Sequence, residues 1–185
     1  MPLVGIISRL ADQKGFDLIA QVINDVLSLD IQFVVLGTGE KKYHELLQTV
    51  QTNYPQKLGL YLGFSDELAH QIEAGSDMFL MPSRYEPCGL NQMYSLKYGT
   101  VPIVRATGGL ADTIKEFDPI SGMGNGFVFS TYESRELFKS IDRAILAYQD
   151  QNLWKKIMKN GMSQDFSWKT SAGKYADLYA RLLNR

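Results

Sequence analysis

Short, strongly apolar segments alternate with longer helical patterns along most of the chain, and this alternation limits the fold more than any other feature. It is typical of βαβ units, whose strands are parallel and whose helices cover both faces of the sheet. The apolar segments predict strands at residues 3–8, 31–36, 58–62, 78–81, 101–105 and 127–129. Helical periodicity predicts helices at residues 16–29, 41–52, 66–74, 90–98, 134–148, 153–159 and 170–183, with a short one beginning at Asp112. Because no repeat or linker interrupts the pattern, we expect one α/β domain over residues 1–185, built on a single doubly wound parallel sheet.

Composition excludes several classes of function. Lys and Arg number 19 and Asp and Glu number 20, so nothing indicates a nucleic acid or an anionic membrane as partner. The single cysteine, Cys88, excludes an internal disulfide and a cysteine-rich metal site. The sequence has no Asp-x-Asp motif for a divalent ion, and we expect no metal. It also lacks an apolar segment of about 20 residues and a signal-peptide pattern.

The unusual loops all follow predicted strands. They are residues 8–15, 37–39, 63–65, 83–90 and 107–110, whereas the loops that precede strands are plain. In doubly wound folds, ligands bind outside the carboxyl ends of the strands, near the point where the strand order reverses. This asymmetry predicts one edge of the sheet as the binding edge.

The loop around Glu86 is the most informative of these. A strand over residues 77–82 leads into Glu86, and Pro87 and Gly89 precede a helix that starts at about Leu90. The free N–H groups and dipole of a helix N-terminus suit a phosphate or pyrophosphate. A neighbouring carboxylate would repel that phosphate unless a sugar, whose hydroxyls donate to carboxylates, lies between them. The loop therefore predicts half of a sugar-diphosphate site, the alternative being that Glu86 caps the helix.

Arg9 and Lys14 lie on the loop after the first strand, just before the helix that Gly15 opens. Cations near a helix N-terminus oppose the dipole. Their presence there makes physical sense if an anion binds between them, since Arg can contact two phosphate oxygens at once and Lys supplies a mobile charge. On spacing alone, two solvated surface cations are an equally good interpretation.

Two glycine turns give weaker signals. Gly37-Thr38-Gly39 resembles part of a dinucleotide fingerprint, but the full motif is absent and a tight turn is the better interpretation. Gly108 and Gly109 could let the backbone approach a ligand closely, or could form a plain connector.

Phe64 and Cys88 also lie on the predicted binding edge. Phe64, between Gly63 and Ser65, could stack on a nucleobase, although aromatic residues more often pack into a core. Cys88 could be a nucleophile, but neither histidine has a sequence context that suggests a base for it.

Four segments taken together resemble the bacterial glycogen synthases and the plant starch synthases: residues 8–15, 82–90, 97–99 and 107–113. The resemblance covers essentially the whole chain and is most specific around Glu86. It implies a retaining glucosyltransferase of the GT-B fold, in which two Rossmann-like domains face each other across a cleft. The chain resembles only the C-terminal, nucleotide-sugar-binding half, so the N-terminal domain is expected to be missing.

The resemblance also implies residue roles. Arg9 and Lys14 would hold the diphosphate and stabilise its departure, and Glu86 would bind the glucose hydroxyls. Phe64 would stack on adenine, and the amides around Gly89 would cradle the phosphates. The implied nucleotide-sugar contacts are Gly63, Phe64, Ser65, Cys88, Gly89, Leu90, Asn91, Tyr94, Thr107, Gly108 and Gly109.

Three of these positions depart from the pattern. Asn91 stands where Thr is common and Phe64 where Tyr is common, and both changes keep the chemistry. Tyr94 stands where the wider superfamily has a second glutamate that grips the ribose, which leaves ribose recognition open.

The implied reaction is transfer of glucose from ADP-glucose to the 4-hydroxyl at the non-reducing end of an α-1,4-glucan, with retention and without cofactor or metal. The expected partners are the donor, the glucan and the N-terminal domain; the location would be the bacterial cytoplasm or the plant plastid. A UDP-glucose enzyme with another acceptor and a non-catalytic nucleotide- or carbohydrate-binding module remain as alternatives. The domain by itself is expected to bind ADP weakly and to make no glucan.

Overall fold

Six parallel strands form one sheet in the computed structural model of the chain, which describes residues 1–183. The predicted domain, residues 1–185, also includes Asn184 and Arg185, which lie outside the described residues. The strands are β1 (Leu3–Ile7), β2 (Gln32–Gly37), β3 (Leu58–Leu62), β4 (Met78–Met81), β5 (Val101–Arg105) and β6 (Phe127–Phe129). Their order is β3-β2-β1-β4-β5-β6, and every neighbouring pair is parallel. The predicted doubly wound parallel sheet is confirmed.

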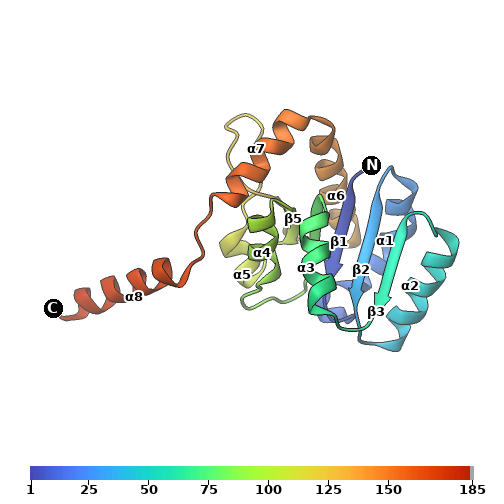
Figure 1. Ribbon diagram of the computed structural model, residues 1–185, viewed down its shortest axis with the longest axis horizontal. Helices are drawn as coiled ribbons and strands as arrows, with labels where there is room; N and C mark the ends of the chain where they lie inside the picture. Colours follow the sequence, from blue (N-terminus) through green and yellow to red (C-terminus); the bar gives the residue numbers. More distant parts are fainter. Residues whose placement is uncertain (184–185) are drawn as a thin grey trace.

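Helices cover both faces of this sheet (Figure 1). On one face lie α1 (Phe16–Ser28), α2 (Lys41–Asn53) and α6 (Ser134–Gln149); on the other lie α3 (Asp66–Gly75), α4 (Asn91–Tyr98) and α5 (Gly108–Thr113). Helix α7 (Gln151–Met162) packs against α4 and α6. The strands are almost continuously apolar because both of their faces are covered.

Three details differ from the prediction. Helix α5 already begins at Gly108, so Asp112 lies near its end rather than at its start. Helix α7 begins earlier than predicted because the side chain of Asp150 caps it, accepting hydrogen bonds from the amides of Asn152 and Leu153. A 3-10 turn, Asp12–Lys14, precedes α1.

The buried side of α1 shows how sequence periodicity becomes packing. Its buried residues recur every three or four positions, and Phe16 at its start is completely buried. Phe127 of the last strand stacks against Trp154 of α7, which anchors this helix to the sheet.

The last helix, α8 (Trp168–Leu183), lies away from the rest of the chain (Figure 1). None of its residues is buried. Within residues 1–183, no helix has the length and apolar character needed to cross a membrane.

The strand order reverses between β1 and β4, which are neighbours at the centre of the sheet. From β1 the chain proceeds outward to β2 and β3, and from β4 it proceeds the other way to β5 and β6. The loops after β1 and β4 therefore diverge and leave a crevice between them. These are the loops that carry Lys14 and Glu86.

Candidate functional site

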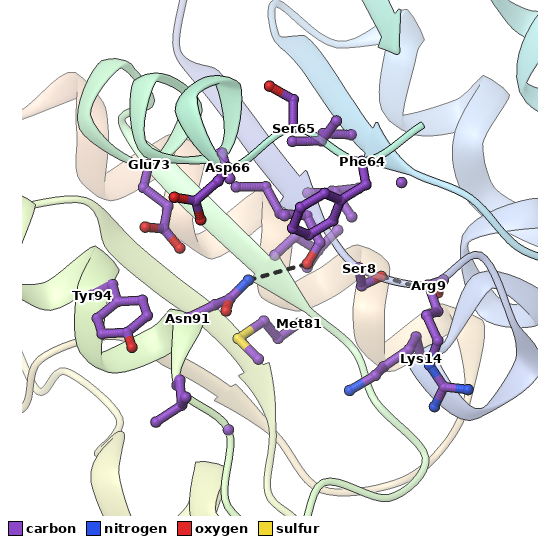
Figure 2. A pocket seen from close by; sticks show the side chains of 18 of the residues that line it. Ser8, Arg9, Lys14, Phe64, Ser65, Asp66, Glu73, Met81, Asn91 and Tyr94 are labelled. Carbon is purple, nitrogen blue, oxygen red and sulfur yellow. Dashed lines mark hydrogen bonds between the residues drawn. The ribbon is translucent and has the colours of Figure 1, made fainter. Parts of the chain in front are cut away.

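A cavity of about 460 Å³ opens at the carboxyl edge of the sheet, a size typical of small-molecule sites (Figure 2). It lies at the reversal of strand order, between the loops after β1 and β4 and the helices α3 and α4. Ten of the predicted site residues line it: Arg9, Lys14, Gly63, Phe64, Ser65, Glu86, Gly89, Leu90, Asn91 and Tyr94. The topology has thus brought together residues that lie as far as 85 positions apart, from Arg9 to Tyr94.

Lys14 and Glu86 form the closest charged contact in the cavity. Lys14 Nζ lies 2.6 Å from Glu86 Oε2, and the Ser83 hydroxyl donates to the same oxygen at 3.1 Å. Glu86 is only 7% exposed, so its carboxylate depends on these partners. Glu86 does not cap α4, whose N-terminus has no side-chain cap.

Arg9 lies near this pair but outside it. Its guanidinium donates to the side-chain oxygen of Gln13 at 3.0 Å, and it makes no ion pair among residues 1–183. Figure 2 shows Arg9 and Lys14 on the same side of the cavity. An arginine and a lysine side by side, one of them without a carboxylate, suit an anion with several oxygens.

The N-terminus of α4 adds backbone donors. Gly89 has a φ of 75°, which turns the chain into the helix, and the amides of Leu90, Asn91 and Gln92 donate to no acceptor within the described part of the chain. Asn91 does not cap the helix; its side-chain amide donates to the carbonyl of Ile7 at 3.2 Å and ties α4 to the end of β1. The helix end therefore has free N–H groups beside the two cations.

Gly15 sets the spacing between the two loops. It has a φ of 82°, and a Cβ atom there would lie 2.2 Å from the carbonyl oxygen of Pro82. Only glycine permits this close approach. The approach brings the Lys14 loop against the end of β4, within reach of Glu86.

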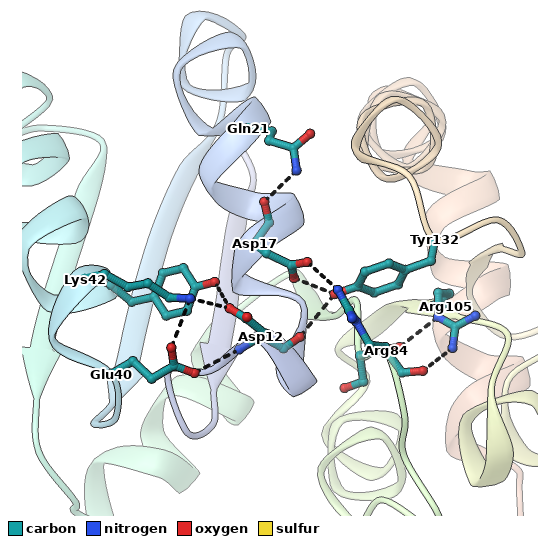
Figure 3. A network of polar contacts seen from close by, with 10 residues as sticks. Asp12, Asp17, Gln21, Glu40, Lys42, Arg84, Arg105 and Tyr132 are labelled. Atoms are coloured by element: carbon teal, nitrogen blue, oxygen red, sulfur yellow. Dashed lines mark hydrogen bonds and ion pairs between the residues drawn. The ribbon is translucent and has the colours of Figure 1, made fainter.

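Polar contacts fix both loops from outside the cavity (Figure 3). The Asp12 carboxylate accepts from Lys42 at 2.7 Å and from the Tyr43 hydroxyl, and these hydrogen bonds lower the pKa of Asp12. On the other side, Arg84 pairs with Asp17 at 2.9 Å.

Tyr132 and Arg105 complete that second cluster. The Tyr132 hydroxyl donates to Asp17, and burial together with this acidic partner raises the pKa of Tyr132 to about 12. Arg105 donates through Nε to the carbonyl of Ser83 at 2.8 Å. The two clusters thus hold the Lys14 and Glu86 loops by groups that do not themselves line the cavity.

Four predicted site residues do not line the cavity: Cys88, Thr107, Gly108 and Gly109. Cys88 is an exposed free thiol. The two glycines pack behind the Glu86 loop, where the amide of Gly109 donates to the carbonyl of Glu86 at 3.1 Å. A Cβ at Gly109 would lie 1.9 Å from the carbonyl oxygen of Cys88. This turn therefore supports the loop from behind.

Phe64 is 88% exposed at the rim of the cavity and does not cap the core, which was the interpretation favoured by its residue type alone. Its neighbour Ser65 caps α3 by accepting from the amide of Leu68 at 3.2 Å. Gly37 and Thr38 also line the cavity. Gly37 lets β2 end against the Ser8 carbonyl, from which a Cβ would be 1.9 Å, so its role is close packing of adjacent loops.

Glu73 was missed by the sequence analysis. It lies on α3, lines the cavity, and is only 3% exposed, and burial raises the pKa of Glu73 to about 7. The only available signal was an acid beside Ile72 on the apolar side of a predicted helix. Among residues 1–183, no cluster of three or more His, Cys, Asp and Glu side chains could hold a metal ion.

Comparisons with known proteins agree with this geometry. The family model for glycosyl transferases group 1 matches residues 1–162. A glycogen synthase from Koribacter versatilis is 52% identical over 181 residues, which is 98% of this chain and 37% of the relative. The chain therefore spans well under half the length of that curated relative.

Solved structures agree as well. The catalytic domain of starch synthase IV from Arabidopsis thaliana, bound to ADP and acarbose, matches with a TM-score of 0.87 and 38% identity. That match covers 100% of this chain and 39% of the other. The C-terminal domain of a group 1 glycosyl transferase from Francisella tularensis shares the fold alone, with a TM-score of 0.69, 21% identity and coverage of 87% and 82%. The expected resemblance to glycogen and starch synthases is confirmed.

Proposed function

Because the chain belongs to the glycosyl transferases group 1 family, we propose that it supplies the nucleotide-sugar site of a retaining α-1,4-glucosyltransferase. The donor is ADP-glucose, and the acceptor is the 4-hydroxyl at the non-reducing end of a glycogen or starch glucan. The relatives named glycogen synthase and the ADP-bound starch synthase support this choice of donor and product. Their greater length supports a second, N-terminal domain that completes the cleft.

One observation carries the proposal: the contact of Lys14 with Glu86 inside a cavity at the reversal of strand order. When glucose leaves the nucleotide, negative charge accumulates on the diphosphate. Arg9 and the free amides of α4 line the same cavity as Lys14, which can reach that charge by exchanging its contact with Glu86 for one with the diphosphate. Donors placed around a leaving group contribute several kcal/mol. Because Glu86 lies 2.6 Å from Lys14, a sugar attached to a diphosphate that binds Lys14 would lie beside the Glu86 carboxylate.

The remaining lining residues fit the rest of the donor. Phe64 is exposed at the rim, where a nucleobase can stack on its ring. The carboxylate of Glu86 accepts hydrogen bonds, as hexose hydroxyls require. Phosphates near Lys14, glucose near Glu86 and adenine near Phe64 account for three different chemistries in one cavity.

Calorimetric titration of the 185-residue chain with ADP and with UDP tests the proposal. We expect ADP to bind and UDP to bind more weakly. Lys14→Ala should reduce ADP affinity, while Lys41→Ala, which removes an exposed lysine of α2, should not. Equal binding of ADP and UDP would remove the support for ADP-glucose as the donor, and tighter binding of UDP would favour UDP-glucose. Unchanged ADP binding by Lys14→Ala would remove the basis of the assignment.

A further inference from the structure

Glu73 is a buried acid in the cavity to which the proposed function gives no task. Its side chain is 3% exposed and belongs to α3, on the side of the cavity opposite Arg9 and Lys14 (Figure 2). Within residues 1–183 its carboxyl group accepts no hydrogen bond, and its nearest basic partner is His70 Nδ1 at 4.0 Å. A carboxyl group is costly to bury without partners, so this one is available for donors that a ligand supplies.

The position of Glu73 along the cavity indicates which part of a ligand it would meet. The free amides of α4 begin at Leu90, and Tyr94 follows about one helical turn later, roughly 6 Å further along the helix axis. Helix α3 packs against this part of α4, with the His70 ring 6.5 Å from the Tyr94 ring. A ligand whose phosphates lie at the start of α4 would therefore place its next unit between Tyr94 and Glu73.

In a nucleoside diphosphate that next unit is the ribose. Its 2′- and 3′-hydroxyls are hydrogen-bond donors, and a carboxylate accepts such bonds at two oxygens. Tyr94 offers a phenol on the facing helix but no carboxylate. The base extends in another direction, toward the exposed ring of Phe64 at the rim.

We propose that Glu73 is the ribose-recognition residue of this site, its carboxylate accepting hydrogen bonds from the ribose hydroxyls of the bound nucleoside diphosphate. The inference rests on the proposed function, because it takes the phosphates to lie near Lys14. Burial raises the pKa of Glu73 to about 7, as expected for an acid that has no partner until a ligand arrives.

Analogues that lack one hydroxyl test the assignment directly. At pH 8, calorimetry on the 185-residue chain would compare ADP with 2′-deoxy-ADP and 3′-deoxy-ADP. We expect at least one analogue to bind about tenfold or more weakly than ADP, as for loss of a hydrogen bond to a charged group. In Glu73→Met the ratio of the ADP affinity to the analogue affinity should fall to nearly one, and in Glu73→Gln this ratio should be intermediate.

The matched control is Glu67→Gln, which changes an exposed acid of the same helix and should keep the wild-type preference. Pyrophosphate binding should be equal in all four proteins, which shows that the variants fold and keep the phosphate end. Equal binding of the three nucleotides by the wild type, or a preference that persists in Glu73→Met, would overturn the assignment of Glu73 alone. A wild type that binds neither ADP nor pyrophosphate would overturn the proposed function as well.

Discussion

Glu86 and Glu73 both bury a carboxyl group in the same cavity, but their surroundings differ. Glu86 contacts the Lys14 ammonium and the Ser83 hydroxyl, and the loop that carries it is braced by backbone contacts. Glu73 lies on a regular helix, has His70 at 4.0 Å, and its pKa is raised to about 7. One acid is paired before any ligand binds, and the other is not.

The difference shows two ways in which a binding site tolerates a buried acid. A paired acid is held in place by its partners, here the Lys14 ammonium and the Ser83 hydroxyl. An unpaired acid binds a proton more readily instead, and it regains its charge when a ligand offers donors. The two ends of the cavity are therefore expected to respond differently to mutation and to pH.

The largest effect of a substitution is expected at the Lys14–Glu86 pair. Under the proposed function, Lys14→Ala in the whole enzyme would remove a donor from the departing diphosphate and should lower kcat by about 100- to 1,000-fold. Steady-state kinetics with ADP-glucose and a glucan primer measure this effect. Lys41→Ala serves as the control with unchanged kcat, and a Lys14→Ala enzyme as fast as wild type would contradict the role of the lysine.

The next largest effect is expected where Gly108 and Gly109 pack behind the Glu86 loop and brace it. Gly109→Ala places a methyl group 1.9 Å from the carbonyl oxygen of Cys88, so we expect destabilisation by about 1–3 kcal/mol. Urea unfolding of the 185-residue chain measures it. Gly173→Ala, where a Cβ meets nothing within 4 Å on helix α8, should be neutral or stabilising by up to about 1 kcal/mol. Equal unfolding midpoints for the two variants would argue against the brace.

The contribution of Glu73 to folding stability should depend on pH. The pKa of Glu73 is raised in the folded chain from 4.5 to about 7, so the folded state binds the proton more tightly than the unfolded state. The stability that comes from this proton is fully present below pH 4.5 and is lost as pH rises through 7. Glu73→Gln should therefore gain stability relative to wild type between pH 5 and pH 8, by on the order of 2 kcal/mol.

Thermal melts of wild type and Glu73→Gln at both pH values measure that gain. Glu67→Gln, which removes an exposed acid from the same helix, should show no such change with pH. A constant difference between wild type and Glu73→Gln from pH 5 to pH 8 would mean that the carboxyl group is ionised throughout.

The smallest effect is expected at the start of the helix that carries Glu73. Ser65→Ala removes the cap of α3 and should cost about 1 kcal/mol, because the amide of Leu68 loses its acceptor. Thr52→Ala, near the end of α2, removes a hydroxyl that caps no helix N-terminus and should cost less. Chemical denaturation resolves the two, and equal losses would show that the cap is unimportant.

Much of this site could be predicted because it follows from topology. Lys14 and Glu86 follow strands whose carboxyl ends are neighbours in any doubly wound sheet that reverses order between them. Their proximity therefore follows from the strand pattern, and Gly15 sets the final spacing. The predicted strands match the observed ones to within a residue or two at either end for the same reason: apolar segments bounded by glycine or polar residues leave little choice.

Glu73 and the Gly108-Gly109 turn could not be assigned from the sequence. Which side of α3 faces the cavity depends on how that helix rotates against β1, β2 and α4, and a short helix with few apolar residues leaves the rotation open. The Gly108-Gly109 turn does not line the cavity, and its predicted contact with the ligand stays a prediction. Its position behind Glu86 depends on where β5 ends relative to β4, which residue types do not reveal.

The contact between Lys14 and Glu86 has a consequence for turnover. An anion that draws the ammonium toward itself leaves the acid without its counter-charge, and only a molecule that also brings hydroxyls makes good that loss. Under the proposed function, an intact donor would satisfy both groups at once, whereas the spent nucleotide would satisfy only one. Re-formation of the salt bridge would then compete with the bound product and favour its release.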